Sequence, residues 1–367
     1  MKIIKTYRRK LKLNKGQEKR LLQWIGTCRF VYNLALEQRI LFWSQWKKGI
    51  HKYEQSSQLS ELRKEYEWIN DVPFECLQLS FYRLDKSYQN FFRGGGFPKF
   101  AKRDKYNSIM FKQNIGKNDN KFRISKIGWL NTFKDREVKG KIKQIIIKKE
   151  IDSFYINIVT EFEQEPINIS SENQVGIDMG LVHFATLSTG EKIKNPGYFV
   201  DYQGKLRMEN RSLARKKKGS NNRRKQKIRV QKVYRKIKRC RKDFLHKESI
   251  KLINQFGLIV VEDLNVSGIL KINHLSKLIQ DASWSKFFNM LEYKSNWYGN
   301  KFIKVDPKYT SQTCNVCGYS DKENRTSQSE FECKECDNVD NADFNASKNI
   351  LERGLGKTII RKRKTLV

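Results

Sequence analysis

The chain has 367 residues, of which 38% are hydrophobic and 31% are charged, enough for two or three folded units with a large polar surface. Its 75 Lys and Arg outnumber 39 Asp and Glu, giving a formal net charge of +36. Such a charge opposes compaction unless a polyanion neutralises it, so nucleic acid is the expected partner and an anionic membrane surface the alternative. No apolar run approaches transmembrane length and the N-terminus lacks the apolar core of a signal peptide, so we expect no membrane partner and a cytoplasmic location.

The N-terminal half divides into a strand, a helical region, a loop and a β-rich region. Residues 1–15 are basic and strand-like, and residues 16–90 carry apolar side chains at helical spacing. Alternating apolar residues predict β-structure over residues 105–165, compatible with a small β-barrel or a curled sheet.

The loop at residues 91–103, FFRGGGFPKFAKR, interleaves aromatic and basic side chains. Glycines allow close backbone approach to a phosphate, and aromatic rings offer faces on which bases stack. The pattern predicts nucleic-acid contacts at Arg93 and Lys99. An ordinary basic surface turn explains it equally well.

Residues 205–242 contain 19 Lys or Arg against one acid, Glu209. Val230, Val233 and Ile237 keep helical spacing, which predicts a helix with one apolar seam. A charge run is usually a solvated face, but the near absence of acids favours contact with phosphates. The candidate nucleic-acid residues here are Arg215, Lys216, Lys217, Lys218, Arg223 and Arg224.

Three carboxylates stand at the ends of expected elements. Asp178 ends a short strand, Glu262 ends the buried strand FGLIVVE, and Asp343 opens a helix that closes at Gly354. In a βββαβαβα arrangement they can converge on one edge of a sheet and bind two Mg²⁺ ions about 4 Å apart, which activate water. Each acid alone is better explained as a strand-end residue meeting solvent, and only the combination favours a metal site.

Four cysteines form two CxxC pairs separated by fifteen residues: Cys314, Cys317, Cys333 and Cys336. Two such hairpins complete a tetrahedron of thiolates, so the spacing predicts a zinc ribbon whose Zn²⁺ is structural. Two disulfides would need an oxidising compartment, and the ribbon spacing disfavours an iron–sulfur cluster. Cys28, Cys76 and Cys240 are scattered and are expected to be buried or spare thiols.

Three segments resemble RuvC motifs I, II and III: GIDMG (176–180), IVVEDLNV (259–266) and NADFNASKNIL (341–351). The chain as a whole resembles the TnpB family, the insertion-sequence-encoded, RNA-guided DNA endonucleases related to type V CRISPR effectors. Further segments carry this resemblance: RKKKGSNNRRKQK (215–227), RKDFLHK (241–247), LEYKSNWYG (291–299), TCNVCG (313–318) and, more weakly, CRFVYN (28–33) and GFPKF (96–100). It implies a catalytic triad of Asp178, Glu262 and Asp343. Asn341 and Ala342 depart from the Asp-Arg pair that often precedes the last acid.

The resemblance also implies a multidomain α+β fold: a wedge β-barrel with an inserted helical lobe, then a RuvC/RNase H-like α/β nuclease domain interrupted by the zinc ribbon. The implied boundaries are 1–15 and 91–170 for the wedge, 16–90 for the helical recognition lobe, 171–305 and 340–354 for the nuclease domain, 306–339 for the zinc-ribbon target-nucleic-acid-binding module, and 355–367 for a basic tail.

The implied activity is RNA-guided cleavage of DNA. A guide RNA from the transposon end pairs with double-stranded target DNA beside a short motif that the protein reads, and a single Mg²⁺-dependent site cuts both strands. The protein is expected to be a monomer in its ribonucleoprotein, in the prokaryotic cytoplasm. The alternatives are a miniature CRISPR effector of the same lineage, a nuclease-inactive guide-directed repressor, and a structure-selective nuclease without a guide.

Overall fold

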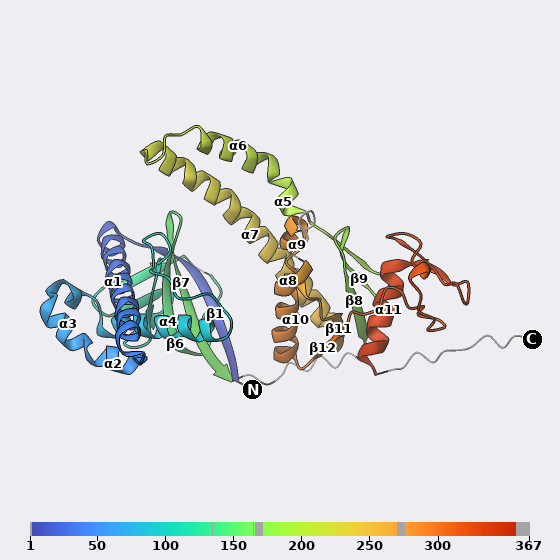
Figure 1. Ribbon diagram of the computed structural model, residues 1–367, viewed down its shortest axis with the longest axis horizontal. Helices are drawn as coiled ribbons and strands as arrows, with labels where there is room; N and C mark the ends of the chain where they lie inside the picture. The colour runs from blue at the N-terminus through green and yellow to red at the C-terminus, as the bar shows by residue number, and fades with distance from the viewer. Residues whose placement is uncertain (1, 134, 164, 166–171, 270–275, 357–367) are drawn as a thin grey trace, which may run out of the picture. The chain divides into compact units, whose positions relative to one another are not determined.

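The structure is a computed structural model that describes residues 2–133, 135–163, 165, 172–269 and 276–356. The chain forms two compact units, Met1–Gln164 and Glu165–Val367 (Figure 1). Each unit has its own hydrophobic core.

The first unit is built on a seven-stranded antiparallel sheet with the order β2-β6-β7-β1-β5-β4-β3. Its strands are β1 (Lys2–Lys12), β2 (Ser108–Phe111), β3 (Gly116–Asn118), β4 (Lys121–Ile124), β5 (Gly128–Thr132), β6 (Lys141–Glu150) and β7 (Ser153–Glu163). The predicted wedge β-barrel is not confirmed: the described residues form no closed barrel, because β2 and β3 each pair on one side only. Helices α1 and α4 pack against β2.

Those helices occupy the region predicted to be helical, and they share one core with the sheet. They are α1 (Lys15–Trp46), α2 (Lys52–Ser57), α3 (Leu59–Glu65), the 3₁₀ helix η1 (Glu67–Asp71) and α4 (Phe74–Phe92). A reciprocal pair of hydrogen bonds between Asn14 and Gln17 caps the start of α1. Trp24 of α1 is fully buried, with its ring centroid 6.3 Å from that of Phe111 on β2.

The second unit contains a five-stranded sheet with the order β10-β9-β8-β11-β12. The strands are β8 (Gln174–Met179), β9 (His183–Leu187), β10 (Lys192–Lys194), β11 (Leu258–Glu262) and β12 (Lys301–Val305). The first three form an antiparallel meander, and β11 and β12 run parallel to β8. The fully buried strand predicted from FGLIVVE is confirmed as β11.

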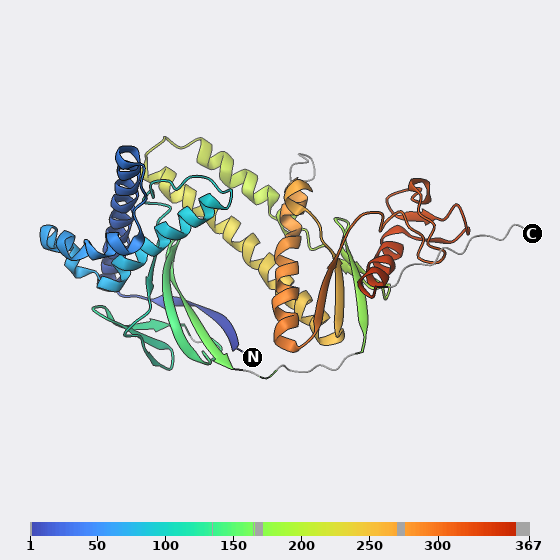
Figure 2. The same ribbon diagram turned by 60° about the horizontal axis from the view of Figure 1, so that its bottom comes forward.

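The helices of this unit cover both faces of the sheet (Figures 1 and 2). They are α5 (Tyr198–Asp201), α6 (Gln203–Ala214), α7 (Asn221–Gln255), α8 (Val266–Ile269), α9 (Ser276–Ala282), α10 (Trp284–Tyr298) and α11 (Ala342–Gly354). Val175 and Ile177 of β8 join the core beneath α7 and α10. On the opposite face, Val260 packs with Ile350 of α11.

The basic stretch that was predicted to be one helix is a hairpin of two, α6 and α7, lying side by side (Figure 2). The turn at residues 215–220 contains Gly219 with φ +85°, a left-handed conformation that ends the helical path. Leu206 of α6 packs with Val233 and Ile237 of α7.

Between β12 and α11 lies the cysteine segment, with the 3₁₀ helix η2 (Lys322–Asn324) and the paired strands β13 (Glu330–Glu332) and β14 (Val339–Asn341). Of the predicted basic tail, residues 357–367 lie outside the described residues. Where the structure describes the chain, none of its helices combines the length and apolarity needed to span a membrane.

Candidate functional site

Two of the three candidate carboxylates lie on neighbouring parallel strands. In the register of β8 and β11, Ile177 pairs with Val261, so Asp178 and Glu262 are the next residues along each strand. Alternation along the strands places both on the face that α11 covers. Parallel pairing therefore brings the two acids side by side at one sheet edge, as their strand-end positions predicted.

Asp343 reaches the same edge from the first turn of α11. This helix packs along β8 because Gly176 leaves room for it: a Cβ atom at Gly176 would lie 2.1 Å from the Ser347 backbone oxygen. Asp343 is one turn before Ser347, and Asp178 is two residues beyond Gly176. The crossing of helix and strand therefore carries the third acid toward the other two.

The charges of Glu262 and Asp343 act on Asp178. Its pKa is raised to about 7, chiefly by burial and then by the negative charges of Glu262 and Asp343, while Arg325 acts in the opposite direction. Burial also raises the pKa of Glu262, which is 8% exposed. The hydrogen bond from Thr310 and the charge of Arg353 partly offset that rise. The site thus has a surplus of negative charge that cations would stabilise.

Arg325 is the one nearby cation that makes an ion pair with a member of this trio within the described chain. Its Nη2 atom is 3.8 Å from Oδ1 of Asp343. It comes from the cysteine segment, just after η2, and no sequence pattern marked it as a site residue. The cysteine segment therefore contributes charge to the acidic edge.

Asp178, Glu262 and Asp343 have the oxygen ligands that Mg²⁺ prefers, on rigid elements, with incompletely compensated charge. Their carboxylates are nevertheless spread more widely than the cysteine sulfurs. Across the described ranges, the four cysteines form the one group of at least three His, Cys, Asp or Glu side chains close enough to share an ion. Mutual repulsion keeps uncompensated carboxylates apart, and bound cations would draw them together.

The four cysteine sulfurs all lie within 4.8 Å of one another. The Sγ atoms of Cys314 and Cys336 are 3.7 Å apart, and those of Cys317 and Cys333 are 3.5 Å apart. A tetrahedron with Zn–S bonds of about 2.3 Å has sulfurs roughly 3.8 Å apart, so the cluster is compatible with structural zinc.

The two cysteine hairpins repeat one backbone design. In the first, the Cys314 amide donates to the Tyr319 oxygen and the Gly318 amide donates to the Cys314 oxygen. Cys333 has the same two bonds, to Asn338 and from Asp337. Gly318 and Asp337 share the left-handed conformation, with φ +76° and +56°. The sequence showed this turn only in the first hairpin, because only there is it marked by glycine.

The predicted nucleic-acid residues occupy different environments. Arg93 is the exposed cap residue of α4, and Lys99 is exposed in the following loop. Nearby, Tyr88, Phe91, Phe92 and Phe97 form a cluster of aromatic rings in which Phe92 is 78% exposed. Such a cluster is compatible with base stacking.

In the α6–α7 turn, Arg215, Lys216, Lys217 and Lys218 are exposed, and so is Arg224 at the start of α7. Arg223 differs, because its Nη1 atom donates to the backbone oxygens of Leu213 and Lys216. These bonds close the turn between the two helices. A structural role for Arg223 is therefore visible.

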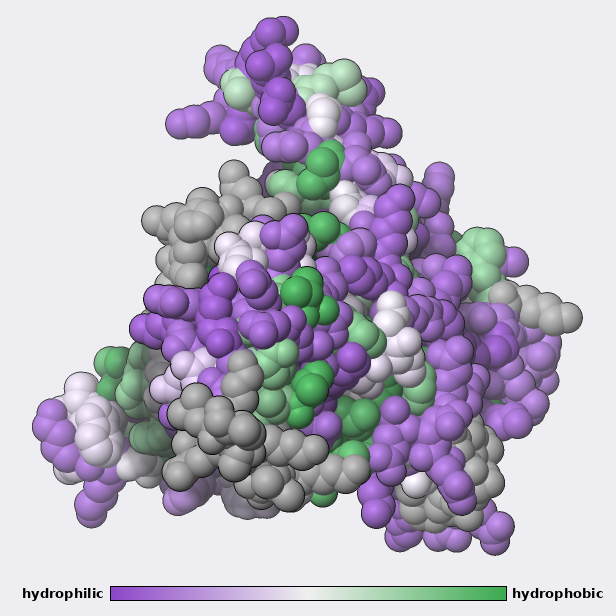
Figure 3. Space-filling model, turned by 90° about the vertical axis from the view of Figure 1, so that its right-hand side faces the viewer, coloured by the Kyte–Doolittle hydropathy of each residue, from purple (hydrophilic) through white to green (hydrophobic). Residues whose placement is uncertain are grey.

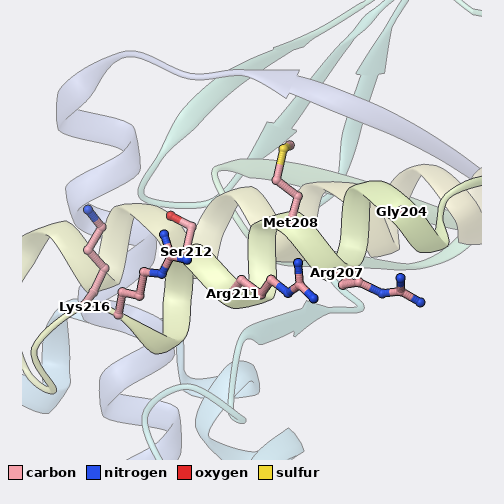
Figure 4. A pocket seen from close by; sticks show the side chains of 7 residues that line it. Gly204, Arg207, Met208, Arg211, Ser212 and Lys216 are labelled. Carbon is pink, nitrogen blue, oxygen red and sulfur yellow. The ribbon is translucent and has the colours of Figure 1, made fainter.

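Sequence reasoning missed Arg207 and Arg211 of α6, which form a row with the predicted Arg215, the residue that caps the end of this helix. Arg207, Arg211 and Arg215 recur every four residues, so they follow one side of the helix. They line a pocket together with Gly204, Met208, Ser212 and Lys216. Figure 4 shows Arg207 and Arg211 projecting from one side and Met208 from the other. The i, i+4, i+8 spacing was the available signal.

The face drawn in Figure 3 is mostly hydrophilic, with hydrophobic residues in small separate groups.

Three protein-family models match the chain. "Probable transposase" matches residues 157–273, "Cas12f1-like, TNB domain" residues 284–350, and "Helix-turn-helix domain" residues 1–48. In the structure this last span forms β1 and the single 32-residue helix α1.

The chain is 34% identical to "Putative RNA-guided DNA endonuclease InsQ" of Escherichia coli (strain K12), over 96% of its own length and 93% of that protein. It is 30% identical to "Putative RNA-guided DNA endonuclease" of Streptomyces pristinaespiralis, over 92% of its own length and 86% of that protein. The chain belongs to the TnpB family. A third relative, "CRISPR-associated endodeoxyribonuclease Cas12f1" of Sulfoacidibacillus thermotolerans, is 29% identical over 62% of this TnpB-family chain and 58% of its own. The resemblance expected from the motifs is confirmed.

Proposed function

We propose that this protein is an RNA-guided DNA endonuclease with a single Mg²⁺-dependent site formed by Asp178, Glu262 and Asp343. The observation that carries the proposal is the convergence of these three acids from β8, β11 and α11 on one edge, where burial, and then the charges of Glu262 and Asp343, raise the pKa of Asp178. Relatives that match nearly the whole chain are named RNA-guided DNA endonucleases.

The order of elements in the second unit supports a RuvC/RNase H-like nuclease domain. Three antiparallel strands are followed by two strands parallel to the first, with helices between them and a last helix across β8. In this proposal, residues 171–305 and 340–354 make up the nuclease domain and residues 306–339 the zinc-ribbon module. The sheet of the first unit corresponds to the wedge domain, and the helices of residues 16–90 correspond to the recognition lobe.

Two bound Mg²⁺ ions would supply an activated water and stabilisation of the leaving oxygen of a phosphodiester. The protein fixes where the ions would bind, because it fixes the three acids that would hold them. Asp178 and Glu262 are fixed by strand pairing, and Asp343 by the packing of α11 on Gly176. Partial burial of the acids excludes bulk water and strengthens their interaction with cations. Arg325 offers a positive charge to a phosphate beside Asp343.

Zinc held by the four cysteines is proposed to be structural, because four thiolates leave no coordination position for a substrate. Nucleic-acid contacts are proposed for seven exposed basic side chains: Arg93, Lys99, Arg215, Lys216, Lys217, Lys218 and Arg224. Arg223 is proposed to support the turn between α6 and α7. The net charge of +36 suits a protein that contacts both a guide RNA and its paired DNA.

The test is to purify the protein from cells, sequence the RNA that accompanies it, and add double-stranded DNA matching that RNA. We expect Mg²⁺-dependent cutting of both strands that disappears in Asp178→Ala. Asp243→Asn is the matched control, because Asp243 is 65% exposed and pairs with Lys247 in α7. Full activity of Asp178→Ala, or binding without cleavage by the wild-type protein, would overturn the proposal. RNA copied from a repeat array would identify a CRISPR effector.

A further inference from the structure

The segment from Asp306 to Thr313, which connects β12 to the first cysteine, is tied to α11 by one row of side chains. Asn345, Asn349 and Arg353 are spaced four residues apart and donate hydrogen bonds to backbone oxygens of this segment. Those bonds are Asn345 Nδ2 to Thr313 (2.8 Å), Asn349 Nδ2 to Thr310 (2.9 Å) and Thr313 (2.6 Å), and Arg353 Nη1 to Asp306 (2.5 Å) and Lys308 (2.9 Å).

These bonds hold the segment firmly because most are made out of contact with water. Asn345 is 0% exposed and Asn349 is 2% exposed. Breaking a bond to a buried amide leaves a polar group unsatisfied, which costs more than the bond itself contributes. The position of the segment is therefore fixed relative to α11, the helix that carries Asp343.

Thr310, in the middle of this segment, reaches the acidic edge. It is 2% exposed, and its Oγ1 atom lies 2.5 Å from Oε1 of Glu262 and 3.0 Å from the backbone oxygen of Pro307. A hydroxyl has one proton to donate, and an ionised carboxylate only accepts. When Glu262 is ionised, the Thr310 hydroxyl therefore donates to it.

The Glu262 carboxylate is hydrogen-bonded by Thr310. In the described part of the chain, Thr310 is the one hydrogen-bond donor to the Glu262 carboxylate. β11 fixes the backbone of Glu262, but a glutamate side chain has three further rotatable bonds. A hydroxyl held by a buried segment selects one orientation among those available.

We propose that Thr310 is a positioning residue that orients the Glu262 carboxylate for metal binding. The row Asn345, Asn349 and Arg353 sets Thr310 relative to Asp343, so one helix aligns two of the three acids. Asn345 also accepts from the Asn315 amide, between Cys314 and Cys317, at 2.9 Å. This hydrogen bond also ties the zinc ribbon to α11. This inference rests on the proposed Mg²⁺ site.

The experiment measures Mn²⁺ binding to the zinc-loaded, full-length protein by the electron paramagnetic resonance signal of free Mn²⁺. We expect Thr310→Val, which keeps shape but lacks the hydroxyl, to weaken Mn²⁺ binding about 10–100-fold, the usual effect of losing a residue that orients a metal ligand. Thr310→Ser keeps the hydroxyl and should stay within about threefold of wild type. Zinc content should match in all three proteins, and all three should be folded at the temperature of the titration.

Asp178→Asn separates this inference from the proposed function. Loss of Mn²⁺ binding in Asp178→Asn with unchanged binding in Thr310→Val would overturn the positioning role and leave the metal site standing. Unchanged binding in Asp178→Asn would overturn the metal site itself. If Thr310→Val fails to fold, Thr310→Ala gives the same comparison with Thr310→Ser, and equal Mn²⁺ binding by those two would overturn the inference.

Discussion

Gly176 of β8 lies directly against Ser347 of α11. A Cβ atom at Gly176 would be 2.1 Å from the Ser347 backbone oxygen and 2.6 Å from the Leu351 backbone nitrogen. Atoms at such distances overlap, so only glycine permits the helix and the strand to touch here. Because β8 carries Asp178 and α11 carries Asp343, this contact sets the separation of the two acids.

Gly176→Ala is therefore expected to push α11 away from β8. Overpacking against backbone destabilises a fold by about 1–3 kcal/mol or more. We expect a lower melting temperature of the second unit and loss of DNA cleavage, measured by calorimetry and a cleavage assay. Gly204→Ala in α6 is the control, because no atom lies within 4 Å of the added carbon. A Gly176→Ala protein as stable and active as the control would contradict the role of this contact.

Stability should depend on pH through Asp178, whose pKa is raised from its ordinary 3.8 to about 7. The folded protein then binds this proton more tightly than the unfolded chain does, so the free energy of unfolding falls as pH rises from about 4 to about 7. Asp178→Asn lacks this ionisation. Urea unfolding across that pH range, without divalent cations, should show the wild-type protein losing stability relative to the variant. Parallel curves would show that Asp178 titrates normally.

The raised pKa of Asp178 also makes metal binding depend on pH, in the opposite direction to stability. Mg²⁺ binds the ionised carboxylate, so protons compete with it below pH 7. Affinity for Mg²⁺, measured by calorimetric titration, should therefore increase with pH up to about 7 and then level off. An affinity that does not vary between pH 5 and 7 would contradict the assignment of Asp178 as a ligand.

Zinc removal should loosen the segment that leads to Thr310. We expect one Zn²⁺ per chain by elemental analysis, lost or strongly weakened in Cys336→Ser, because one of four thiolates is missing. The melting temperature of the second unit should fall with it. Cys240→Ser in α7 is the control, since Cys240 lies outside the cluster. Zinc retained at full affinity in Cys336→Ser would rule out four-cysteine coordination.

Lys294 of α10 is 6% exposed, and its ammonium donates to the His246 backbone oxygen and to Ser249 Oγ. Burial lowers its pKa to about 8, so the folded protein releases this proton more easily than the unfolded chain. Stability should rise as pH increases from about 8 to the unfolded value of 10.5. Lys294→Met should lack this rise and be neutral or stabilising by about 1–3 kcal/mol at pH 7.

The matched control for Lys294→Met is Lys247→Met, because Lys247 is exposed and makes an ion pair with Asp243. Its effect should stay within about 0.5 kcal/mol, as for most surface substitutions. Chemical denaturation at pH 7 and pH 10 distinguishes the two. A Lys294→Met protein that loses stability by several kcal/mol at pH 7 would show that the ammonium and its two acceptors are favourable.

The arginine row on α6 should act on the salt dependence of RNA binding. If Arg211 contacts a phosphate, Arg211→Gln lowers the slope of log affinity against log salt by about 0.7–0.9. Lys143→Gln is the control, because Lys143 makes an ion pair with Glu161 at 2.9 Å. Fluorescence anisotropy with single-stranded RNA at several salt concentrations measures both. Equal slopes for Arg211→Gln and the wild type would exclude that contact.

Local spacing determined much of this protein. The interval between the two CxxC pairs indicated a compact four-sulfur cluster, and the apolar run before Glu262 indicated a buried strand. The helix at Asp343, ending at Gly354, was likewise readable from capping and periodicity. These features can be predicted from the sequence because each depends on residues that are near one another along the chain.

Contacts between distant segments were decided only by the tertiary structure. The order of the strands in the first unit is set by pairing between distant segments, and Leu206 of α6 packs with Val233 and Ile237 of α7 across the hairpin. Thr310 and Glu262 are 48 residues apart, and Arg325 reaches Asp343 from the cysteine segment. No local periodicity encodes such pairs, because they exist only after sheet pairing and helix packing have fixed where each backbone runs.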